Sequence, residues 1–294
     1  MKRELIVQRD PKSPISEVFR TLRTNIQFMN AKNNLKTVLI TSTMPGEGKS
    51  WVSSNLAVTF AQAGKKVILV DADMRKGRQY SIFGETPRPG LSNYLSGVGF
   101  EEDAADSNGI YNYIRETEID NLYLIVAGDI PPNPSELLSS SQMIDLLQKL
   151  KEEFDVVIVD GTPSQLVTDA LILARLVDST VIVTASKQTK KEDLKKIVNN
   201  IKNIGGDISG VIVNKIPISP KKYEQSYYYG SKTIKSNPTN VTNVKKTPSS
   251  RKMKNDELPK ALKSRIQIEN GEKISKEKTN EIFQQINEYM DSKK

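Results

Sequence analysis

The chain has 294 residues and a net charge of +8, and it contains neither cysteine nor histidine. Their absence excludes a thiolate nucleophile, an imidazole base, and zinc or haem sites built from the usual ligands. Any acid–base chemistry therefore falls to Asp, Glu, Lys or Tyr. The positive charge is concentrated near the C-terminus, because residues 230–294 carry fifteen Lys or Arg and eight Asp or Glu.

No apolar run approaches the roughly 18 residues that a membrane-spanning helix needs. The N-terminal segment also lacks the apolar core of a signal peptide. We therefore expect a cytoplasmic protein. The absence of cysteine fits that compartment without deciding it.

Strand-length apolar runs alternate with helical stretches along most of the chain, after an amphipathic helix predicted over residues 16–29. The runs are mostly unbroken Val, Ile and Leu, which is typical of strands buried on both faces of a parallel sheet. The predicted strands cover residues 38–41, 66–71, 122–126, 156–160, 180–184 and 209–213. The predicted helices between them cover residues 51–63, 141–153, 168–177 and 191–204. This order predicts an α/β fold with a doubly wound, mainly parallel sheet and helices on both faces.

The composition changes after the last predicted strand. Four of the ten tyrosines, Tyr223, Tyr227, Tyr228 and Tyr229, fall within seven positions. Residues 231–250 are rich in Ser, Thr, Asn, Lys and Pro, which predicts a flexible linker. A helical apolar pattern returns over residues 275–290, so a short terminal helix is expected there.

The strongest chemical signal is TSTMPGEGKS, residues 41–50, between a predicted strand and a predicted helix. In a phosphate-binding loop of this kind, backbone N–H groups surround the phosphates, the lysine reaches the β and γ phosphates, and the next hydroxyl holds Mg²⁺. Thr43 stands where the usual motif begins with glycine. The predicted cofactors are ATP and Mg²⁺. The predicted nucleotide-binding residues are Pro45, Gly46, Glu47, Gly48, Lys49, Ser50 and Trp51.

Carboxylates follow two of the predicted strands. Asp71 and Asp73 end the second strand, and Asp160 ends the fourth. P-loop proteins hold Mg²⁺ with carboxylates delivered in this way to the carboxyl edge of the sheet. Each aspartate alone fits an ordinary turn, but together with the loop lysine they define one site. The predicted metal ligands are Ser50, Asp71 and Asp160, and the predicted catalytic residues are Lys49, Asp71, Asp73 and Asp160.

These motifs, in this order, resemble those of the bacterial tyrosine kinases of capsular and exopolysaccharide synthesis. The likeness is to the soluble type that Gram-positive bacteria make separately from its membrane activator. It spans about residues 13–230 through the segments EVFRTLRTN, PGEGKS, ILVDADMR, PPNPSELL, VVIVDGTP and the tyrosine cluster. The resemblance implies an enzyme that transfers phosphate from ATP to protein tyrosine. It also implies that Asp71 and Asp73 supply an Mg²⁺-linked aspartate and a base for the tyrosine hydroxyl.

The resemblance carries further implications for assembly. It makes Glu17, Arg20 and Arg23 an interface between subunits of a ring-shaped homo-oligomer. A neighbouring subunit is then expected to phosphorylate the clustered tyrosines. A transmembrane polysaccharide co-polymerase-type adaptor is expected to activate the kinase and recruit it to the inner face of the cell membrane.

The chain departs from the family pattern at three places. Gly77 and Tyr80 stand where proline and histidine are frequent, and Gly161 interrupts the usual Asp-Thr-Pro-Pro. Neither change removes a predicted phosphate or Mg²⁺ contact. The basic tail after Gly230 is the largest departure, because these kinases usually end near the tyrosine cluster.

Other classes of protein remain open from the residues alone. A partitioning or septum-positioning ATPase shares the P-loop but has an additional lysine where this chain has Met44. A non-catalytic nucleotide-binding scaffold of a polysaccharide export complex would be favoured by loss of Lys49 or Asp71, and both are present. The basic tail fits a solvated extension or weak electrostatic contact with anionic lipid. Nucleic acid is not an expected partner.

The expected organisation has four parts. Residues 1–34 form an N-terminal segment with an oligomerisation helix, and residues 35–220 form the P-loop kinase domain. Residues 221–230 form the tyrosine cluster. Residues 231–294 form a basic, largely disordered tail with a terminal helix.

Overall fold

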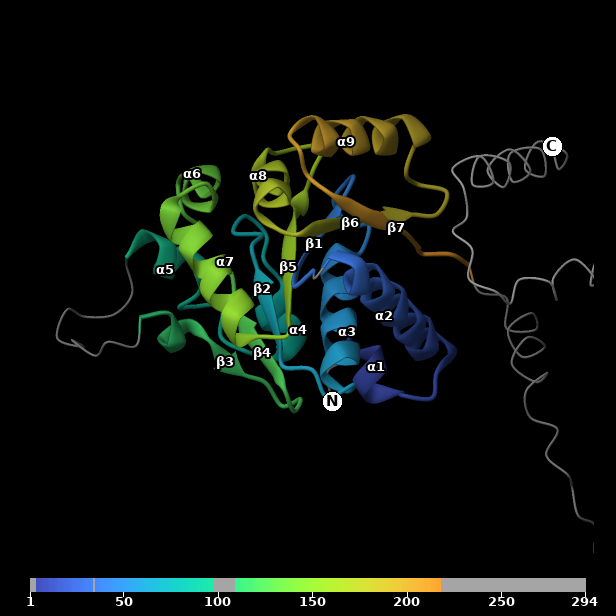
Figure 1. Ribbon diagram of the computed structural model, residues 1–294, viewed down its shortest axis with the longest axis horizontal. Coiled ribbons are helices and arrows are strands. Elements are labelled where there is room, and N and C mark those ends of the chain that lie inside the picture. Colours follow the sequence, from blue (N-terminus) through green and yellow to red (C-terminus); the bar gives the residue numbers. More distant parts are fainter. Residues whose placement is uncertain (1–3, 34, 98–108, 218–294) are drawn as a thin grey trace, which may run out of the picture. The chain divides into compact units, whose positions relative to one another are not determined.

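The computed structural model describes residues 4–33, 35–97 and 109–217 (Figure 1). The chain divides into two units, Met1–Lys232 and Thr233–Lys294, and every described residue belongs to the first. The tyrosine cluster, the basic tail and the helix predicted over residues 275–290 lie outside the described residues. No helix within the described ranges combines the length and apolar character needed to cross a membrane.

Seven strands form one sheet in the order β3-β4-β2-β5-β1-β6-β7. All neighbouring pairs are parallel except β3 with β4. Strands β1, β2, β5 and β6 are buried almost throughout, which accounts for their unbroken apolar sequences. The strands are β1 (Thr37–Ser42), β2 (Val67–Asp71), β3 (Arg115–Glu116), β4 (Leu122–Ile125), β5 (Val156–Pro163), β6 (Ser179–Ala185) and β7 (Ile208–Asn214).

Helices cover both faces of this sheet (Figure 1). One apolar cluster joins the sheet to α1, α2, α3 and α4, and a second joins it to α5, α6, α7, α8 and α9. The prediction of a doubly wound α/β fold is therefore confirmed. The helices are α1 (Ile6–Arg9), α2 (Pro14–Asn33), α3 (Lys49–Ala61), α4 (Gln79–Phe83), α5 (Leu91–Ser96), α6 (Pro134–Leu138), α7 (Ser141–Glu153), α8 (Asp169–Leu176) and α9 (Lys191–Asn203), with a 3-10 turn at Gly109–Tyr113.

The N-terminal helix α2 packs against α3. Phe19 and Ile26 are buried in the shared cluster, and the Phe19 ring meets the Trp51 ring edge-on with centroids 5.2 Å apart. The sequence pattern places Val18 on the same side as Ile26, but Val18 is 55% exposed. The buried stripe of α2 therefore runs through Phe19, and Val18 faces outward.

The strand order brings the Asp71 end of β2, the Asp160 region of β5 and the loop after β1 next to one another. Strand β5 lies between β1 and β2, and Asp71 pairs in register with Asp160. Asp160 is also the register partner of Ile40, three residues before Thr43 in the loop after β1. The phosphate-binding loop and the strand-end aspartates therefore meet at one edge of the sheet.

Candidate nucleotide-binding and catalytic site

The loop between β1 and α3 has the backbone geometry of a phosphate-binding loop. Gly46 and Gly48 have φ angles of 80° and 99°, a region that favours glycine. A Cβ at Gly48 would also collide with Nδ2 of Asn214. Helix α3 begins directly at Lys49, so its unpaired N–H groups and positive dipole end face the loop.

Glu47 closes the base of this loop. Its carboxylate accepts hydrogen bonds from the backbone N–H groups of Thr43 (2.7 Å) and Met44 (2.9 Å). It also accepts bonds from the hydroxyls of Thr43 and of Thr189, which follows β6. Asn214 at the end of β7 donates to the Glu47 carbonyl at 2.8 Å. Thr43, which replaces the usual glycine, thus contributes a hydroxyl that helps to fix the loop.

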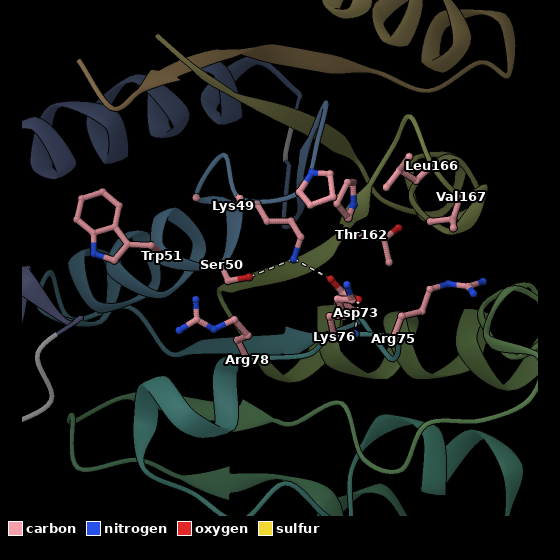
Figure 2. A pocket seen from close by; sticks show the side chains of 14 residues that line it. Lys49, Ser50, Trp51, Asp73, Arg75, Lys76, Arg78, Thr162, Leu166 and Val167 are labelled. Carbon is pink, nitrogen blue, oxygen red and sulfur yellow. Dashed lines mark hydrogen bonds and ion pairs between the residues drawn. The ribbon is translucent and has the colours of Figure 1, made fainter. Parts of the chain in front are cut away.

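Lys49 is the centre of a charged cluster (Figure 2). Its Nζ lies 2.9 Å from Oδ2 of Asp73, 3.8 Å from Oδ1 of Asp160 and 3.1 Å from Oγ of Ser50. Burial disfavours its charge, but the Asp160 and Asp73 carboxylates outweigh burial and raise the pKa of Lys49 above its ordinary value. The lysine therefore stays cationic near neutral pH.

The carboxylates outnumber the cation that faces them. Burial, reinforced by the Asp160 charge, raises the pKa of Asp71 to about 8. Burial also raises the pKa of Asp160, although Lys49 opposes this shift. Three aspartates around one lysine leave an excess of negative potential, which a divalent cation would relieve.

The residues present fit Mg²⁺. Oδ1 of Asp160 is buried, and its ion pair with Nζ of Lys49 at 3.8 Å is too long for a hydrogen bond. Within the described ranges, no group of three or more acidic side chains forms a ready-made metal cage. Mg²⁺ in phosphate sites takes one or two protein carboxylates and completes its shell with phosphate and water, so an open arrangement suits it.

A pocket of about 310 Å³ opens beside this cluster. It brings together six of the seven predicted nucleotide-binding residues and Asp73, whereas the Glu47 side chain is turned into the loop. Figure 2 shows Leu166 and Val167 on the side away from Trp51. The pocket is also lined by residues that were not among the predicted site residues, namely Arg75, Lys76, Arg78, Thr162, Pro163, Leu166 and Val167.

The predicted interface residues lie on α2, outside this pocket. Arg20 pairs with Glu17 at 2.8 Å on the exposed surface. Arg23 donates to the carbonyl of Thr59 on α3 at 3.0 Å. A role of these side chains between subunits stays a prediction, as do the phosphate and metal contacts of the site residues.

Two positions, Gln79 and Gly77, lie close to the buried carboxylates, although nothing in the sequence motifs predicts these contacts. Gln79 is fully buried and hydrogen-bonds toward both Asp71 and Asp160. A Cβ at Gly77 would lie 2.9 Å from Oδ2 of Asp71 and 2.6 Å from Cβ of Ala127. The glycine that replaces the family's frequent proline thus lets the chain approach Asp71 closely.

The loop, the sheet order and the strand-end carboxylates define a P-loop nucleotide-binding protein, and comparison with known proteins agrees. Residues 21–212 match the protein family described as an AAA domain. The tyrosine-protein kinase YwqD of Bacillus subtilis is 39% identical over 232 residues, which cover 79% of this chain and 93% of that protein. The chain belongs to the bacterial tyrosine-protein kinases.

One longer relative and two solved structures are also similar to this chain. The tyrosine-protein kinase ptk of Acinetobacter johnsonii is 36% identical over 70% of this chain, but the match covers only 27% of that longer protein. The crystal structure of the chimerical protein CapA2B2 superposes with a TM-score of 0.67 at 39% identity, covering 73% of this chain and 91% of that one. The cell division ATPase MinD of Pyrococcus furiosus has a TM-score of 0.50 at 23% identity, covering 66% of this chain and 79% of that one, and shares the fold.

Proposed function

We propose that the protein transfers the γ-phosphoryl group of ATP to tyrosine hydroxyls, including those of Tyr223, Tyr227, Tyr228 and Tyr229 on a neighbouring copy. The observation that carries this proposal is the cluster around Lys49. The Lys49 cation at the start of α3 lies within 4 Å of the carboxylates of Asp73, which follows β2, and Asp160, which lies within β5, and it is beside the hydroxyl of Ser50. Phosphoryl transfer depends mainly on such positioning and charge neutralisation, so a chain without histidine or cysteine can perform it.

The loop and the lysine bind the nucleotide in this proposal. The N–H groups at the start of α3 face the phosphates, and Lys49 supplies a positive charge to the β and γ phosphates. Glu47 stabilises the loop from beneath. Ser50, Asp71 and Asp160 would hold Mg²⁺, which when bound would neutralise phosphate charge.

Asp73 is the proposed acceptor of the tyrosine proton. It lines the pocket, and its Oδ1 accepts from the backbone N–H of Lys76 at 2.9 Å while Oδ2 faces Lys49. These bonds hold the carboxylate at the pocket wall. In the proposed reaction, the tyrosine oxygen bonds to the γ phosphorus of ATP. The bond between the γ phosphorus and the oxygen that bridges it to the β phosphorus breaks, and ADP leaves. The hydroxyl proton passes to Asp73.

We further propose that the kinase regulates capsular or exopolysaccharide synthesis together with a transmembrane adaptor, which holds it at the inner face of the membrane. The matching segment occupies about a quarter of the longer ptk protein. The difference in length is compatible with a kinase segment that works together with a separate partner in this case. A ring-shaped homo-oligomer, with Glu17, Arg20 and Arg23 at its interfaces, would bring each tyrosine cluster to a neighbouring site.

Product analysis tests the proposed reaction. The full chain is incubated with ATP and Mg²⁺, with and without peptides of candidate adaptor tails, and ADP, free phosphate and protein phosphotyrosine are measured. The proposal expects ADP and phosphotyrosine in equal amounts. ADP with free phosphate and no phosphoprotein would instead indicate a partitioning-type ATPase, and tight nucleotide binding without turnover would indicate a scaffold.

A further inference from the structure

Gln79, the first residue of α4, connects the two buried carboxylates of the site. Its backbone N–H donates to Oδ2 of Asp71 at 2.9 Å. Its side-chain Nε2 donates to Oδ2 of Asp160 at 2.7 Å. A single residue therefore fixes one oxygen of each carboxylate, although Asp71 and Asp160 come from different strands.

The orientation of the Gln79 amide is determined by its neighbours. Nε2 also lies 3.1 Å from the carbonyl of Ser50 and 3.1 Å from the hydroxyl oxygen of Ser53, both in the first turns of α3. Reversing the amide would place its oxygen against the Asp160 carboxylate and the Ser50 carbonyl, which are also acceptors. The nitrogen must face this group, so the amide ties α3 to the end of β5.

This arrangement leaves two buried acceptors without a direct hydrogen bond of normal length. Since Gln79 occupies Oδ2 of Asp160, the other oxygen, Oδ1, faces Lys49, whose Nζ is 3.8 Å away and beyond hydrogen-bond distance. Oε1 of Gln79 is likewise buried without a hydrogen-bond donor among the described residues. Buried polar atoms normally have partners, and a hydrated cation offers both a charge and water donors.

We propose that Gln79 is a positioning residue for the Mg²⁺ site. Its amide nitrogen orients Asp160 so that Oδ1 would be left for the cation or its hydration shell. Its amide oxygen, buried without a donor among the described residues, would be available to accept a hydrogen bond from the hydrated ion. The inference rests on the proposed function only through the Mg²⁺ that the nucleotide brings to Ser50, Asp71 and Asp160.

Metal binding measured apart from catalysis tests this role. Mn²⁺ is a paramagnetic substitute for Mg²⁺, and its affinity for the ADP complex of the full chain is measured by electron paramagnetic resonance. Gln79→Met keeps the side-chain length and the backbone bond to Asp71 but removes the amide. We expect it to weaken Mn²⁺ binding by about tenfold, the lower end of effects seen for outer-shell partners. ADP binding in EDTA should stay unchanged.

Two further variants keep the test decisive. Gln62→Met is the matched control, because Gln62 caps the far end of α3 and its side chain bonds only Gln8 among the contacts described. Gln79→Asn retains the amide on a shorter side chain that no longer reaches Asp160, and it should lose Mn²⁺ affinity as Gln79→Met does. In an Asp160→Asn background, Gln79→Met should change the affinity by less than about twofold, because its partner is already altered.

The possible failures are distinguishable. Unchanged Mn²⁺ affinity in folded Gln79→Met and Gln79→Asn would overturn the inference, whether or not the wild-type chain phosphorylates tyrosine. An equal loss of ADP binding in EDTA would also overturn it, because it would show a general structural role. Normal metal behaviour in a wild-type chain that makes no phosphotyrosine would refute the proposed reaction and leave the role of Gln79 intact.

Discussion

Asp71 and Asp160 are register partners on adjacent parallel strands, and both carboxylates are completely buried. Burial raises the pKa of both acids, and the positive charge that opposes these shifts comes from Lys49. Proteins rarely bury two acids side by side without a cation to share them. The pairing of Asp71 with Asp160 therefore connects the order of strands in the sheet with the unusual ionisation of the site.

Asp71→Asn should stabilise the metal-free protein in a pH-dependent way. The pKa of Asp71 is about 8 in the folded chain and 3.8 ordinarily, so only the folded state retains this proton between those values. Raising the pH through this window therefore costs stability, and the cost is complete above about pH 8. Denaturant unfolding in EDTA should show no gain from Asp71→Asn below pH 4 and the largest gain above pH 8.

The exposed Asp145 on α7 provides a control for the same measurement. Asp145→Asn should leave the pH dependence of stability close to that of the wild-type chain. A gain from Asp71→Asn that is constant from pH 4 to pH 9 would contradict a shifted titration of Asp71.

Asp73→Asn should separate chemistry from nucleotide binding. The amide preserves the shape of the side chain but cannot accept the tyrosine proton, so kcat should fall by about 100-fold or more. The KM for ATP should change little, because the phosphates contact the loop and Lys49 in the proposed arrangement. Steady-state kinetics of tyrosine phosphorylation measure both constants, and a kcat within threefold of the wild type would exclude Asp73 as the base.

Glu47→Gln should weaken nucleotide binding through the loop. Oε2 accepts from two adjacent backbone N–H groups and Oε1 accepts from the hydroxyls of Thr43 and Thr189, so an amide loses a charged acceptor on one of these two sides. Loss of one charge-assisted bond of about 1.5 kcal/mol corresponds to roughly tenfold in ADP affinity if the loop must be reordered on binding. Calorimetric titration measures this affinity. Glu85→Gln, outside the loop, should bind ADP normally, and normal binding by Glu47→Gln would show that the loop does not need its carboxylate.

Arg20→Ala tests the predicted subunit interface. Among the described residues, the hydrogen bonds of the Arg20 side chain go to Glu17 and to the carbonyl of Pro11, both in its own N-terminal region. Its removal should therefore leave folding and ADP binding unchanged while lowering oligomer size and phosphorylation between copies. Light scattering of the full chain checks the size, and an unaltered oligomer would refute the interface role.

The sequence was sufficient for the parts of the site that depend on strand ends. Unbroken apolar runs predict buried parallel strands, and Asp71 and Asp160 follow those runs directly, so their meeting at one sheet edge could be foreseen. Lys49 and Ser50 follow from the loop motif in the same way. The two-residue strand β3 and the short helices leave too few residues for a periodic pattern.

Contacts that depend on how loops and helices pack against one another could not be foreseen. Glu47 looks like an ordinary P-loop residue, and its bond to Thr189 depends on how β6 ends beside the loop. Gln79 lies in a polar stretch without a motif, and its burial follows from the docking of α4 beside α3. On α2, Phe19 is buried and its neighbour Val18 is exposed. The spacing of apolar residues is compatible with a buried stripe through either of them, so the sequence alone does not decide between the two.

Mixing two full-length variants tests most directly whether the chain is a tyrosine kinase that acts between copies. One variant is Lys49→Met, which keeps its tyrosines but loses its phosphate-binding cation. The other keeps Lys49 and has Tyr223, Tyr227, Tyr228 and Tyr229 replaced by phenylalanine. After incubation with ATP, Mg²⁺ and candidate adaptor-tail peptides, mass spectrometry should find phosphotyrosine in the 223–229 cluster of the Lys49→Met copies. ADP release with no phosphotyrosine on either variant would contradict the proposal.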